Sequence, residues 1–335
     1  MPIQTSAPTR IDLAGGTIDI WPLYLFHDNA QTINAAISLR ARARIEPRTD
    51  GRVVFRSEDT DTTDEISDWS QLRLSKLRLL GLLAHWFLNE SGNGRRDGLT
   101  LTTACESPAG AGIAGSSALN VAVCAALAEW CGRTDAPEAL LEIAKNIEAQ
   151  TINVPTGLQD YRPAMYGGIA ALEIGVPGIN RVSLDVDPAE LERRLVLCYT
   201  GEPRNSGTNN WEITKRHLDG DRFIFDCFER IRDTAVAMRA ALIAGDWDAV
   251  GRAIAEEWEN RKSLAPGVTT AAIDGVIARA AAAGSTAAKV CGAGGGGCLF
   301  CYGPPGRRQD IEDALRAGGA RVLPFHIETR GLIRG

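Results

Sequence analysis

The sequence predicts a mixed α/β protein (α+β, two domains). Its 335 residues, 44% of them hydrophobic, are enough for one large core or two ordinary ones. The first third contains short β-branched or alternating stretches broken by turn signals, a pattern typical of strands. Beyond about Pro188, long helical patterns dominate, with a few short strands between them. We place the boundary within residues 178–192, which gives predicted domains of residues 1–185 and 186–335.

The elements of the first half follow from local pattern. Alternating residues predict strands, leucines at helical spacing predict helices, and the acidic, threonine-rich stretch Asp59–Asp68 predicts a loop. Strands are expected over Gln31–Leu39, Ala41–Pro47, Arg52–Ser57, Leu99–Ala104 and Gly167–Ile174, and helices over Gln71–Asn89, Ile113–Cys131 and Pro137–Gln150.

In the second half, Gly245-Asp246 divides a long helical pattern into two helices. Strands are expected over Arg194–Tyr199, Ala287–Val290, Cys298–Tyr302 and Arg321–Ile327, and helices over Asp221–Lys262, Thr269–Ala283 and Arg307–Ala317.

Composition excludes several classes of function. The net charge of −6 argues against nucleic acid as a partner, and no apolar run is long enough to span a membrane. The first ten residues do not resemble a signal peptide, and the eight cysteines lie mostly in apolar stretches, as buried thiols of a reducing compartment do. We therefore expect a cytoplasmic protein. The four histidines are dispersed, which argues against a histidine metal site or a catalytic triad.

The most informative segment is Pro108–Ala118, with the sequence PAGAGIAGSSA. Its glycines allow backbone N–H groups to approach a ligand, and the helix that follows adds further N–H groups and a positive dipole end. The segment predicts an anion site, and phosphate is the expected anion. It is not a P-loop, because no Gly-Lys-Ser/Thr ends it. Taken alone, it is also compatible with a flexible turn whose serine caps the helix.

Three further segments carry chemistry. In Pro8–Asp19, a strand with Arg10 runs into a Gly-Gly turn that presents Asp19, either to accept hydroxyl hydrogen bonds or simply to cap the turn. Glu148 and Asp160 suggest one metal ligand and one general base, or else two unrelated surface acids. Five of the ten residues in Lys289–Cys298 are glycine, so this loop must closely approach a ligand or another backbone, since a plain hairpin needs only one or two.

In this order, the three glycine-rich segments and the acidic pair resemble the GHMP kinase superfamily over nearly the whole chain. Within it, the chain looks most like the sugar kinases that phosphorylate the anomeric hydroxyl of a heptose 7-phosphate. That likeness rests on Ala14–Asp19, Gly157–Asp160, Tyr166–Gly168 and Thr200–Ser206. The resemblance implies the GHMP kinase fold, with a ribosomal S5 domain 2-like N-terminal domain and a ferredoxin-like C-terminal domain.

The chain also departs from the family pattern. Galactokinases carry Glu-His where this chain has Gly16-Thr17, which argues against galactose as the substrate. The phosphate segment is one residue longer between its glycine and its serines than the usual form. The resemblance therefore leaves open whether Ser116 or Ser117 meets the metal.

The resemblance also implies roles for single residues. Asp160 would be the base that accepts the sugar hydroxyl proton, and Arg10 would offset charge on the transferred phosphoryl group. Mg²⁺ would be held by Ser116 or Ser117 together with Glu148. The ATP phosphates would lie on Pro108, Gly110, Ala111, Gly112, Ile113, Ala114, Gly115, Ser116 and Ser117. Substrate contacts are expected from Asp19, Thr17, Gly16, Arg204, Ser206, Gly294 and Gly295, and Trp21 would either stack on a sugar or anchor the N-terminal sheet.

Three alternatives remain at this stage. The chain could be a galactose-, fucose- or glucuronate-type sugar kinase, a mevalonate-type kinase or related decarboxylase of the isoprenoid pathway, or a catalytically silent ligand sensor. The expected partner is a small sugar or sugar phosphate, and a homodimer is left open.

Overall fold

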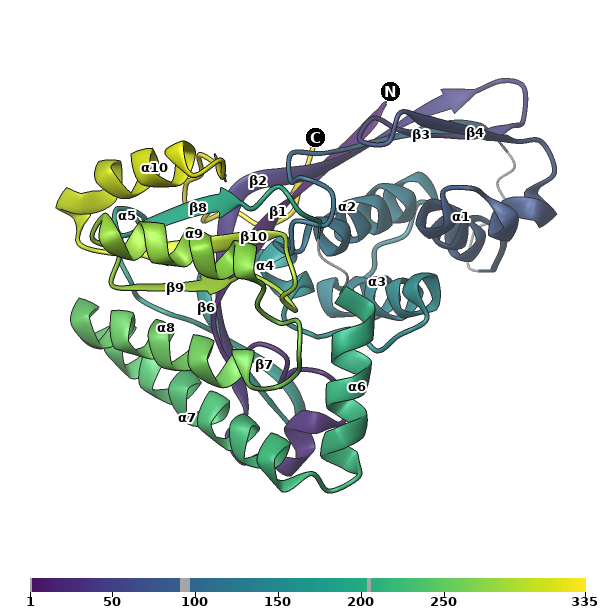
Figure 1. Ribbon diagram of the computed structural model, residues 1–335. Helices are drawn as coiled ribbons and strands as arrows, with labels where there is room; N and C mark the ends of the chain where they lie inside the picture. Colours follow the sequence, from purple (N-terminus) through teal and green to yellow (C-terminus); the bar gives the residue numbers. More distant parts are fainter. Residues whose placement is uncertain (1, 91–96, 204–205) are drawn as a thin grey trace.

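The computed structural model describes residues 2–90, 97–203 and 206–335 (Figure 1). Within these residues, eight strands form one sheet in the order β12-β1-β2-β5-β3-β4, with β6 paired to β2 and β7 paired to β6. The strands are β1 (Ile3–Ala14), β2 (Gln31–Arg48), β3 (Val53–Ser57), β4 (Thr62–Ile66), β5 (Gly98–Cys105), β6 (Ile169–Gly175), β7 (Gly178–Ser183) and β12 (Ile333–Arg334).

The long strand β2 organises this sheet. Its first residues pair with β6 and its last residues pair with β5, while β1 runs antiparallel along its other edge. Near its end, Ala41, Ala43 and Ile45 are buried and Arg42 and Arg44 are exposed, so alternation gives the sheet one apolar and one polar face.

A second, antiparallel sheet has the order β11-β8-β10-β9. Its strands are β8 (Leu195–Tyr199), β9 (Ala287–Val290), β10 (Cys298–Tyr302) and β11 (Arg321–Val322). In β10, Cys298 and Phe300 pack on one hydrophobic cluster, whereas Leu299 and Cys301 pack on another. Cys298 and Cys301 therefore lie on opposite faces of the strand.

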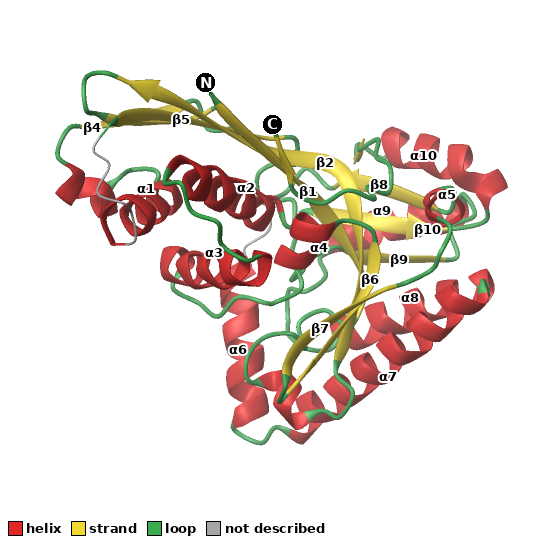
Figure 2. Ribbon diagram, turned by 180° about the vertical axis from the view of Figure 1, so that it is seen from behind, coloured by secondary structure: helices red, strands yellow, loops and turns green. Residues whose placement is uncertain are grey.

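Helices cover both sheets (Figures 1 and 2). α2, α3 and α4 pack beneath the first sheet, α9 and α10 cover one face of the second, and α7 and α8 form an antiparallel pair that packs on both. The helices are α1 (Arg78–Ala84), α2 (Gly115–Trp130), α3 (Pro137–Ile152), α4 (Tyr161–Tyr166), α5 (Pro188–Glu192), α6 (Ser206–Leu218), α7 (Arg222–Ala244), α8 (Trp247–Lys262), α9 (Ala271–Ala282) and α10 (Arg308–Ala317). Short 3₁₀ turns span Leu23–Phe26, Trp69–Leu74 and Pro305–Arg307, and a π turn spans His85–Glu90.

The chain end returns to its beginning. β12 pairs antiparallel with β1, with Thr5 opposite Arg334, and the two ends lie close together in Figure 1. Apart from this strand, residues up to Ser183 build the first sheet and residues from Leu195 onward build the second. The prediction of a mixed α/β architecture in two parts is confirmed.

Several predicted elements need correction. The stretch Gln71–Asn89 is not one helix, because Asp64 accepts hydrogen bonds from Ser75 Oγ at 2.7 Å and from the Lys76 N–H at 2.9 Å and so interrupts it. The expected loop Asp59–Asp68 contains β4. The two strands expected over Gln31–Pro47 are one strand, and of the expected strand Arg321–Ile327 only β11 and an isolated bridge at Ile327 form. The helices α4, α5 and α6 and the strand β7 were not predicted.

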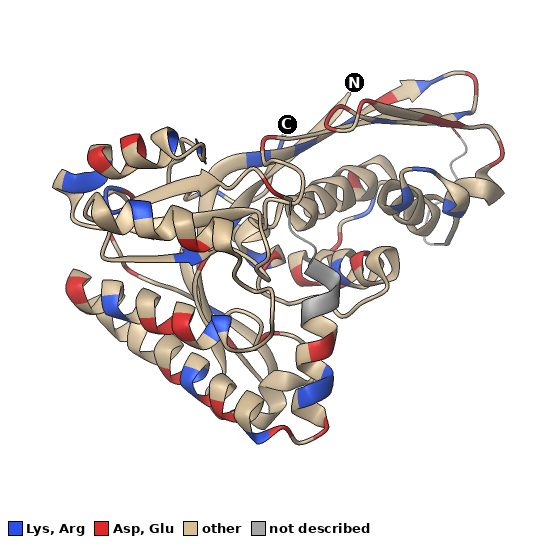
Figure 3. Cartoon of the chain, in the orientation of Figure 1, with Lys and Arg blue, Asp and Glu red and all other residues tan. Residues whose placement is uncertain are grey.

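Acidic and basic residues are interspersed along α7, α8 and α10 (Figure 3). Many of them pair with a neighbour one helical turn away, as Arg308 does with Glu312 and Lys262 with Glu259. Among the described residues, no helix has the length and apolar character needed to cross a membrane.

Candidate active site

The glycine-rich loop after β5 leads into the first turn of α2. Gly110 and Gly112 have positive φ angles of 67° and 78°, which fold the loop back on itself. The N-cap residue of α2, Ala114, is also left-handed and makes no side-chain cap, so the alternative of a serine-capped turn is wrong. The N–H groups of this first turn and the positive end of the helix dipole face the loop, an arrangement that binds anions.

Two serines of the same turn hold a buried carboxylate. Ser116 Oγ donates to Glu148 Oε1 at 2.7 Å, and Ser117 Oγ donates to Oε2 at 2.9 Å. Tyr161 Oη donates to Oε2 at 2.8 Å. Burial raises the pKa of Glu148 above its usual range, although the three hydroxyl groups act in the opposite direction. Carboxylate and hydroxyl oxygens are ligands that Mg²⁺ accepts, so these residues fit a magnesium ion, with both serines as candidate ligands.

Arg10 connects the second acid to both glycine-rich loops. Its Nε and Nη2 donate to Asp160 Oδ1 at 3.0 and 2.5 Å, and its Nη1 donates to the carbonyls of Gly112 at 3.0 Å and Cys291 at 2.8 Å. The Arg10 side chain is 3% exposed and that of Asp160 is 22% exposed, so the carboxylate still reaches solvent. Burial opposes the charge on Arg10, but Asp160 and Asp12 outweigh it and raise the pKa of Arg10.

Asp19 does not project into solvent. It is 1% exposed, and its Oδ2 accepts hydrogen bonds from the N–H groups of Leu158 at 2.6 Å and Gln159 at 2.9 Å. A Cβ on Gly157 would meet this carboxylate, so glycine is required there. Burial raises the pKa of Asp19 to about 6, even though the two N–H groups favour its charged form. Asp19 thus ties the turn after β1 to the loop that presents Asp160.

The third glycine-rich loop packs directly on the first. Gly294–Gly297 have φ angles of 94°, 77°, 150° and 81°, a run that other residues adopt only with strain. The Cys298 N–H donates to the Ala111 carbonyl at 2.6 Å, and the Gly297 N–H donates to the Glu202 carbonyl at 2.7 Å. A Cβ on Gly297 would lie 2.6 Å from the Ala111 carbonyl oxygen. The glycines therefore allow the backbone of the third loop to lie in close contact with that of the first.

The structure describes only some of the remaining predicted substrate residues. Thr17, with a φ of 76°, is buried beside Gly16, while Gly294 and Gly295 lie against the backbone of residues 267–268. Arg204 lies outside the described residues, and for Ser206 the structure gives only its place as the first residue of α6.

Sequence reasoning missed a buried charge cluster behind the site, formed by Asp12, Glu257, Arg261 and Lys289. All four side chains are 4% exposed or less. Asp12 Oδ2 lies 3.3 Å from both Arg261 Nη1 and Lys289 Nζ, and Glu257 Oε1 lies 3.4 Å from Lys289 Nζ. The signal in the sequence was a charged residue inside an apolar stretch, as in Ala287–Val290.

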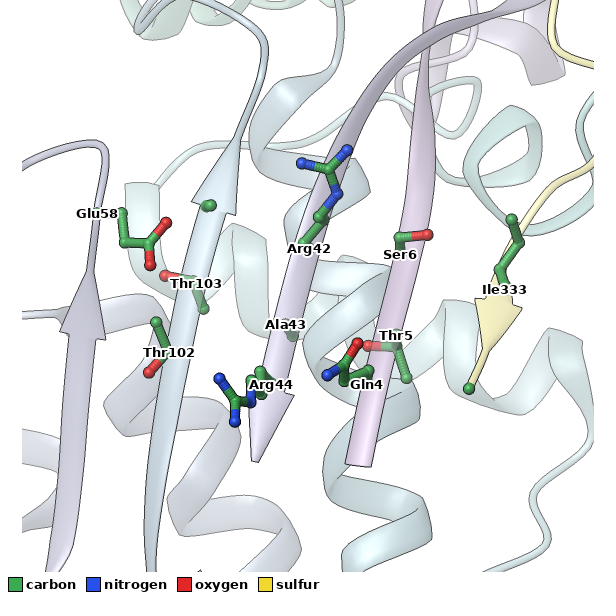
Figure 4. Close-up of a pocket in the computed structure, with 12 residues that line it drawn as sticks. Gln4, Thr5, Ser6, Arg42, Ala43, Arg44, Glu58, Thr102, Thr103 and Ile333 are labelled. Carbon is green, nitrogen blue, oxygen red and sulfur yellow. The ribbon is translucent and has the colours of Figure 1, made fainter. Parts of the chain in front are cut away.

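A hollow on the outer face of the first sheet is separate from this site (Figure 4). It is lined by residues of β1, β2 and β5, with Arg42 and Arg44 among them, and it includes none of the predicted site residues. Arg42 pairs with Glu106 at 2.5 Å and Arg44 pairs with Glu46 at 2.7 Å, so both arginines already have a carboxylate.

Comparisons with known proteins point to one family. The family model described as GHMP kinases N terminal domain matches residues 78–168, and the model GHMP kinases C terminal matches residues 238–321. A D-glycero-alpha-D-manno-heptose 7-phosphate kinase from Campylobacter jejuni is 27% identical and covers 98% of both chains. A mevalonate kinase from Thermococcus sibiricus is 23% identical and covers 99% of this chain and 98% of the relative.

Solved structures show the same fold. The crystal structure of a D-glycero-D-manno-heptose 1-phosphate kinase from Bacteroides thetaiotaomicron has a TM-score of 0.81 at 24% identity, with 99% of this chain and 98% of that chain covered. The protein belongs to the GHMP kinase family and is an ATP-dependent phosphotransferase.

Proposed function

We propose that the protein transfers the γ-phosphate of ATP to the anomeric hydroxyl of a heptose 7-phosphate, giving the 1,7-bisphosphate, with Mg²⁺ as the metal. One observation carries the proposal. Arg10 joins Asp160, the candidate base, to the Gly112 carbonyl of the phosphate loop. Base and nucleotide loop therefore meet at a single guanidinium group. The heptose 7-phosphate kinase that is 27% identical over nearly the whole chain supports this substrate class.

The roles of the residues follow from the needs of phosphoryl transfer, which are positioning and charge stabilisation. The first turn of α2 and its glycine-rich loop bind the ATP phosphates. Asp160 accepts the proton of the sugar hydroxyl. Arg10 offsets negative charge on the transferred group and holds the Asp160 carboxyl in position through two hydrogen bonds. Ser116, Ser117 and Glu148 would hold Mg²⁺, which neutralises charge on the phosphate oxygens.

On the sugar side, we place the substrate next to the loop that Asp19 holds. A cavity of about 550 Å³ adjoins this loop and is lined by Trp21, Tyr24, Thr156 and Leu158, among others. Trp21 is 65% exposed there, so its ring is free to stack on a sugar face. Gly16, Thr17, Gly294, Gly295, Arg204 and Ser206 stay proposed substrate residues, with Arg204 as the partner of the sugar phosphate because a guanidinium matches phosphate geometry.

A substrate screen tests this proposal. ADP release is measured with ATP, Mg²⁺ and each of heptose 7-phosphate, unphosphorylated heptose, galactose, fucose, glucuronate and mevalonate. We expect the highest kcat/KM with heptose 7-phosphate and a new phosphate signal on the anomeric carbon by ³¹P NMR. Higher kcat/KM with another sugar would replace the heptose assignment, and turnover of mevalonate alone would favour the isoprenoid alternative. ATP binding without turnover of any compound would contradict the kinase mechanism.

A further inference from the structure

The buried cluster of Asp12, Glu257, Arg261 and Lys289 joins three elements that also build the site. Asp12 lies on β1 two residues after Arg10, so both side chains leave the same face of the strand. Glu257 and Arg261 are one turn apart on α8, and Lys289 lies on β9, which leads into the third glycine-rich loop. The cluster therefore connects the strand that carries Arg10 to the loop that contacts Arg10.

Arg261 is the member of the cluster that reaches the loop. Its Nη1 lies 3.3 Å from Asp12 Oδ2, and its Nη2 donates to the Gly292 carbonyl at 2.9 Å. The neighbouring carbonyl, that of Cys291, accepts from Arg10 Nη1 at 2.8 Å. Two guanidinium groups thus hold two consecutive carbonyls. Arg10 binds that of Cys291, and Arg261, which is fixed to β1 through Asp12, binds that of Gly292.

Stability alone does not explain such a cluster. Removing four charges from water costs more free energy than their attraction commonly returns, and apolar residues of similar volume often serve a core as well or better. The pairing here is also incomplete, because Asp12 Oδ1 and Glu257 Oε2 are buried without a hydrogen-bond partner among the described residues. Burial raises the pKa of Glu257 above its usual range despite the nearby Lys289 and Arg261.

The charges do balance across the whole assembly. Arg10, Arg261 and Lys289 face Asp160, Asp12 and Glu257, so three cations meet three anions. There is no room for a side chain beside them, because a Cβ on Gly16 would meet both the Asp12 carboxylate and the Arg261 guanidinium. Arg261 is therefore confined to one position, which is what a residue that fixes a loop requires.

We propose that Arg261 is a positioning residue for phosphoryl transfer, which acts through the Gly292 carbonyl on the third glycine-rich loop and so on Arg10. Asp12, Glu257 and Lys289 hold Arg261 in place. This inference rests on the proposed function, because it assigns Arg261 to the reaction in which Arg10 and Asp160 take part. Arg261 touches neither ATP nor sugar in this scheme.

Two variants separate positioning from charge. Arg261→Met removes the contacts with Asp12, Glu257 and the Gly292 carbonyl and leaves Asp12 paired with Lys289. Arg261→Lys keeps the charge, but a single ammonium group does not bridge Asp12 and the Gly292 carbonyl as the planar guanidinium does. We expect Arg261→Met to lower kcat by about tenfold to a hundredfold, the size of effect that small misplacements cause, with KM for both substrates changed less than about threefold. We expect Arg261→Lys to regain the wild-type unfolding temperature but not the wild-type kcat.

Arg239→Met is the matched control, because Arg239 also joins a helix to a strand through a carboxylate, Glu173, at 2.7 Å. It lies on α7 away from the loop, and its removal should leave kcat unchanged. The inference is overturned if Arg261→Met keeps the wild-type kcat, if its loss lies in KM alone, or if Arg261→Lys restores kcat completely. Should Arg261→Met fail to fold, the comparison of Arg261→Lys with wild type decides.

Amide hydrogen exchange gives a readout that does not depend on turnover. The N–H groups of Gly295, Gly297 and Cys298 donate to Val268, Glu202 and Ala111 within the loop packing. We expect faster exchange across residues 291–298 in Arg261→Met and not in Arg239→Met. Faster exchange in an enzyme that phosphorylates no sugar would refute the proposed function alone. An active enzyme whose exchange and kcat are unaffected by Arg261→Met would refute the positioning role alone.

Discussion

At the scale of single residues, Arg10 holds the site together. One guanidinium contacts the candidate base, the phosphate loop and the third glycine-rich loop. It is buried, and the carboxylates around it keep it charged. Because hydrogen bonds to ionised groups are about twice as strong as neutral ones, this residue fixes Asp160 more firmly than a neutral donor would.

The variant Asp160→Asn tests the assigned base. An amide does not accept the hydroxyl proton, so kcat should fall by about 10²- to 10⁴-fold, the usual contribution of a positioned base. KM should change little, because the shape of the side chain is kept. The measurement is steady-state ADP release at saturating ATP and sugar phosphate. Asp135→Asn is the control, since Asp135 also pairs with an arginine, Arg133, at 2.6 Å and is 15% exposed. Equal losses of kcat in the two variants would refute the assignment.

Asp19 should lower the stability of the fold at neutral pH. Its pKa of about 6 lies above the value near 4 of an unfolded aspartate. The stability that Asp19 contributes is therefore complete below about pH 4 and is lost as the pH rises through 6. Asp19→Asn does not ionise, so its free energy of unfolding should exceed that of wild type by up to about 3 kcal/mol at pH 7.5. At pH 4 the two proteins should be alike. Urea unfolding across this range provides the measurement, and a difference independent of pH would disprove the explanation.

The sequence predicted the residues that meet at the site, but it did not predict all the contacts that hold them in place. Arg10, Glu148, Asp160 and the two serines stand in short motifs, and the structure brings them together. The buried cluster was missed because Arg261 and its partner Asp12 are 249 residues apart, so no local pattern records the pairing. The expectation that Asp19 projects from its turn failed for a similar reason, since its N–H donors come from a loop about 140 residues away.

At the scale of elements, the two glycine-rich loops need glycine where their backbones touch. Gly297→Ala would place a methyl group 2.6 Å from the Ala111 carbonyl oxygen. Gly220→Ala is the matched control, with a φ of 85° against 81° and nothing within 4 Å of its added Cβ. Both variants should lose about 1 kcal/mol of stability from left-handed strain. Only Gly297→Ala should also weaken nucleotide binding, because it displaces the phosphate loop.

Isothermal titration with ADP measures this difference. We expect a Kd at least about tenfold higher for Gly297→Ala, the equivalent of about 1.4 kcal/mol, and an unchanged Kd for Gly220→Ala. If both variants bound ADP as tightly as wild type, the contact between the loops would have no part in shaping the nucleotide site.

Elements with strong periodicity were predicted well, and those defined by tertiary contacts were not. The pair α7 and α8, divided at Gly245, lies where the pattern placed it. The expected helix Gln71–Asn89 has the leucine spacing of a helix, but Asp64, from a neighbouring strand, takes the N–H and hydroxyl groups at Ser75–Lys76. The strand β7 forms by pairing with β6. Its own residues are mostly half-exposed or exposed, so its sequence has little of the apolar alternation that predicts a strand.

At the scale of the whole molecule, residues 15–29 join β1 to β2 and pack against the second part. They leave β1 near the site and include His27, which is buried between α6 and α7. His27 Nδ1 lies 2.5 Å from Glu229 Oε1, and its Nε2 lies 2.9 Å from His217 Nε2. The rings of Phe225 and Phe228 pack on both histidines. Because the two histidines are buried against these aromatic rings, we expect the stability of the packing between the two parts to depend on pH.

His217 sets the direction of that sensitivity. Burial and the neighbouring His27 lower the pKa of His217 to about 4, and its Nδ1 has no hydrogen-bond partner among the described residues. A histidine in the unfolded chain titrates near 6.5. The stability that neutral His217 contributes is therefore complete above about pH 6.5 and is lost as the pH falls towards 4. Asp19 acts over the same range with the opposite sign, so the two contributions partly cancel in the wild-type protein.

Single variants should separate the contributions of His217 and Asp19 to the pH dependence of stability. His217→Gln keeps a hydrogen-bond donor for His27 but does not titrate. Its free energy of unfolding, compared with that of wild type, should therefore decrease as the pH rises from 4 to 7. In Asp19→Asn it should rise more steeply than in wild type. His326→Gln removes an exposed histidine, also paired with a carboxylate, and should leave the profile unchanged. Urea unfolding followed by tryptophan fluorescence measures all four proteins. If His217→Gln and His326→Gln gave the same profile, the buried histidine pair would not couple protonation to the joining of the two parts.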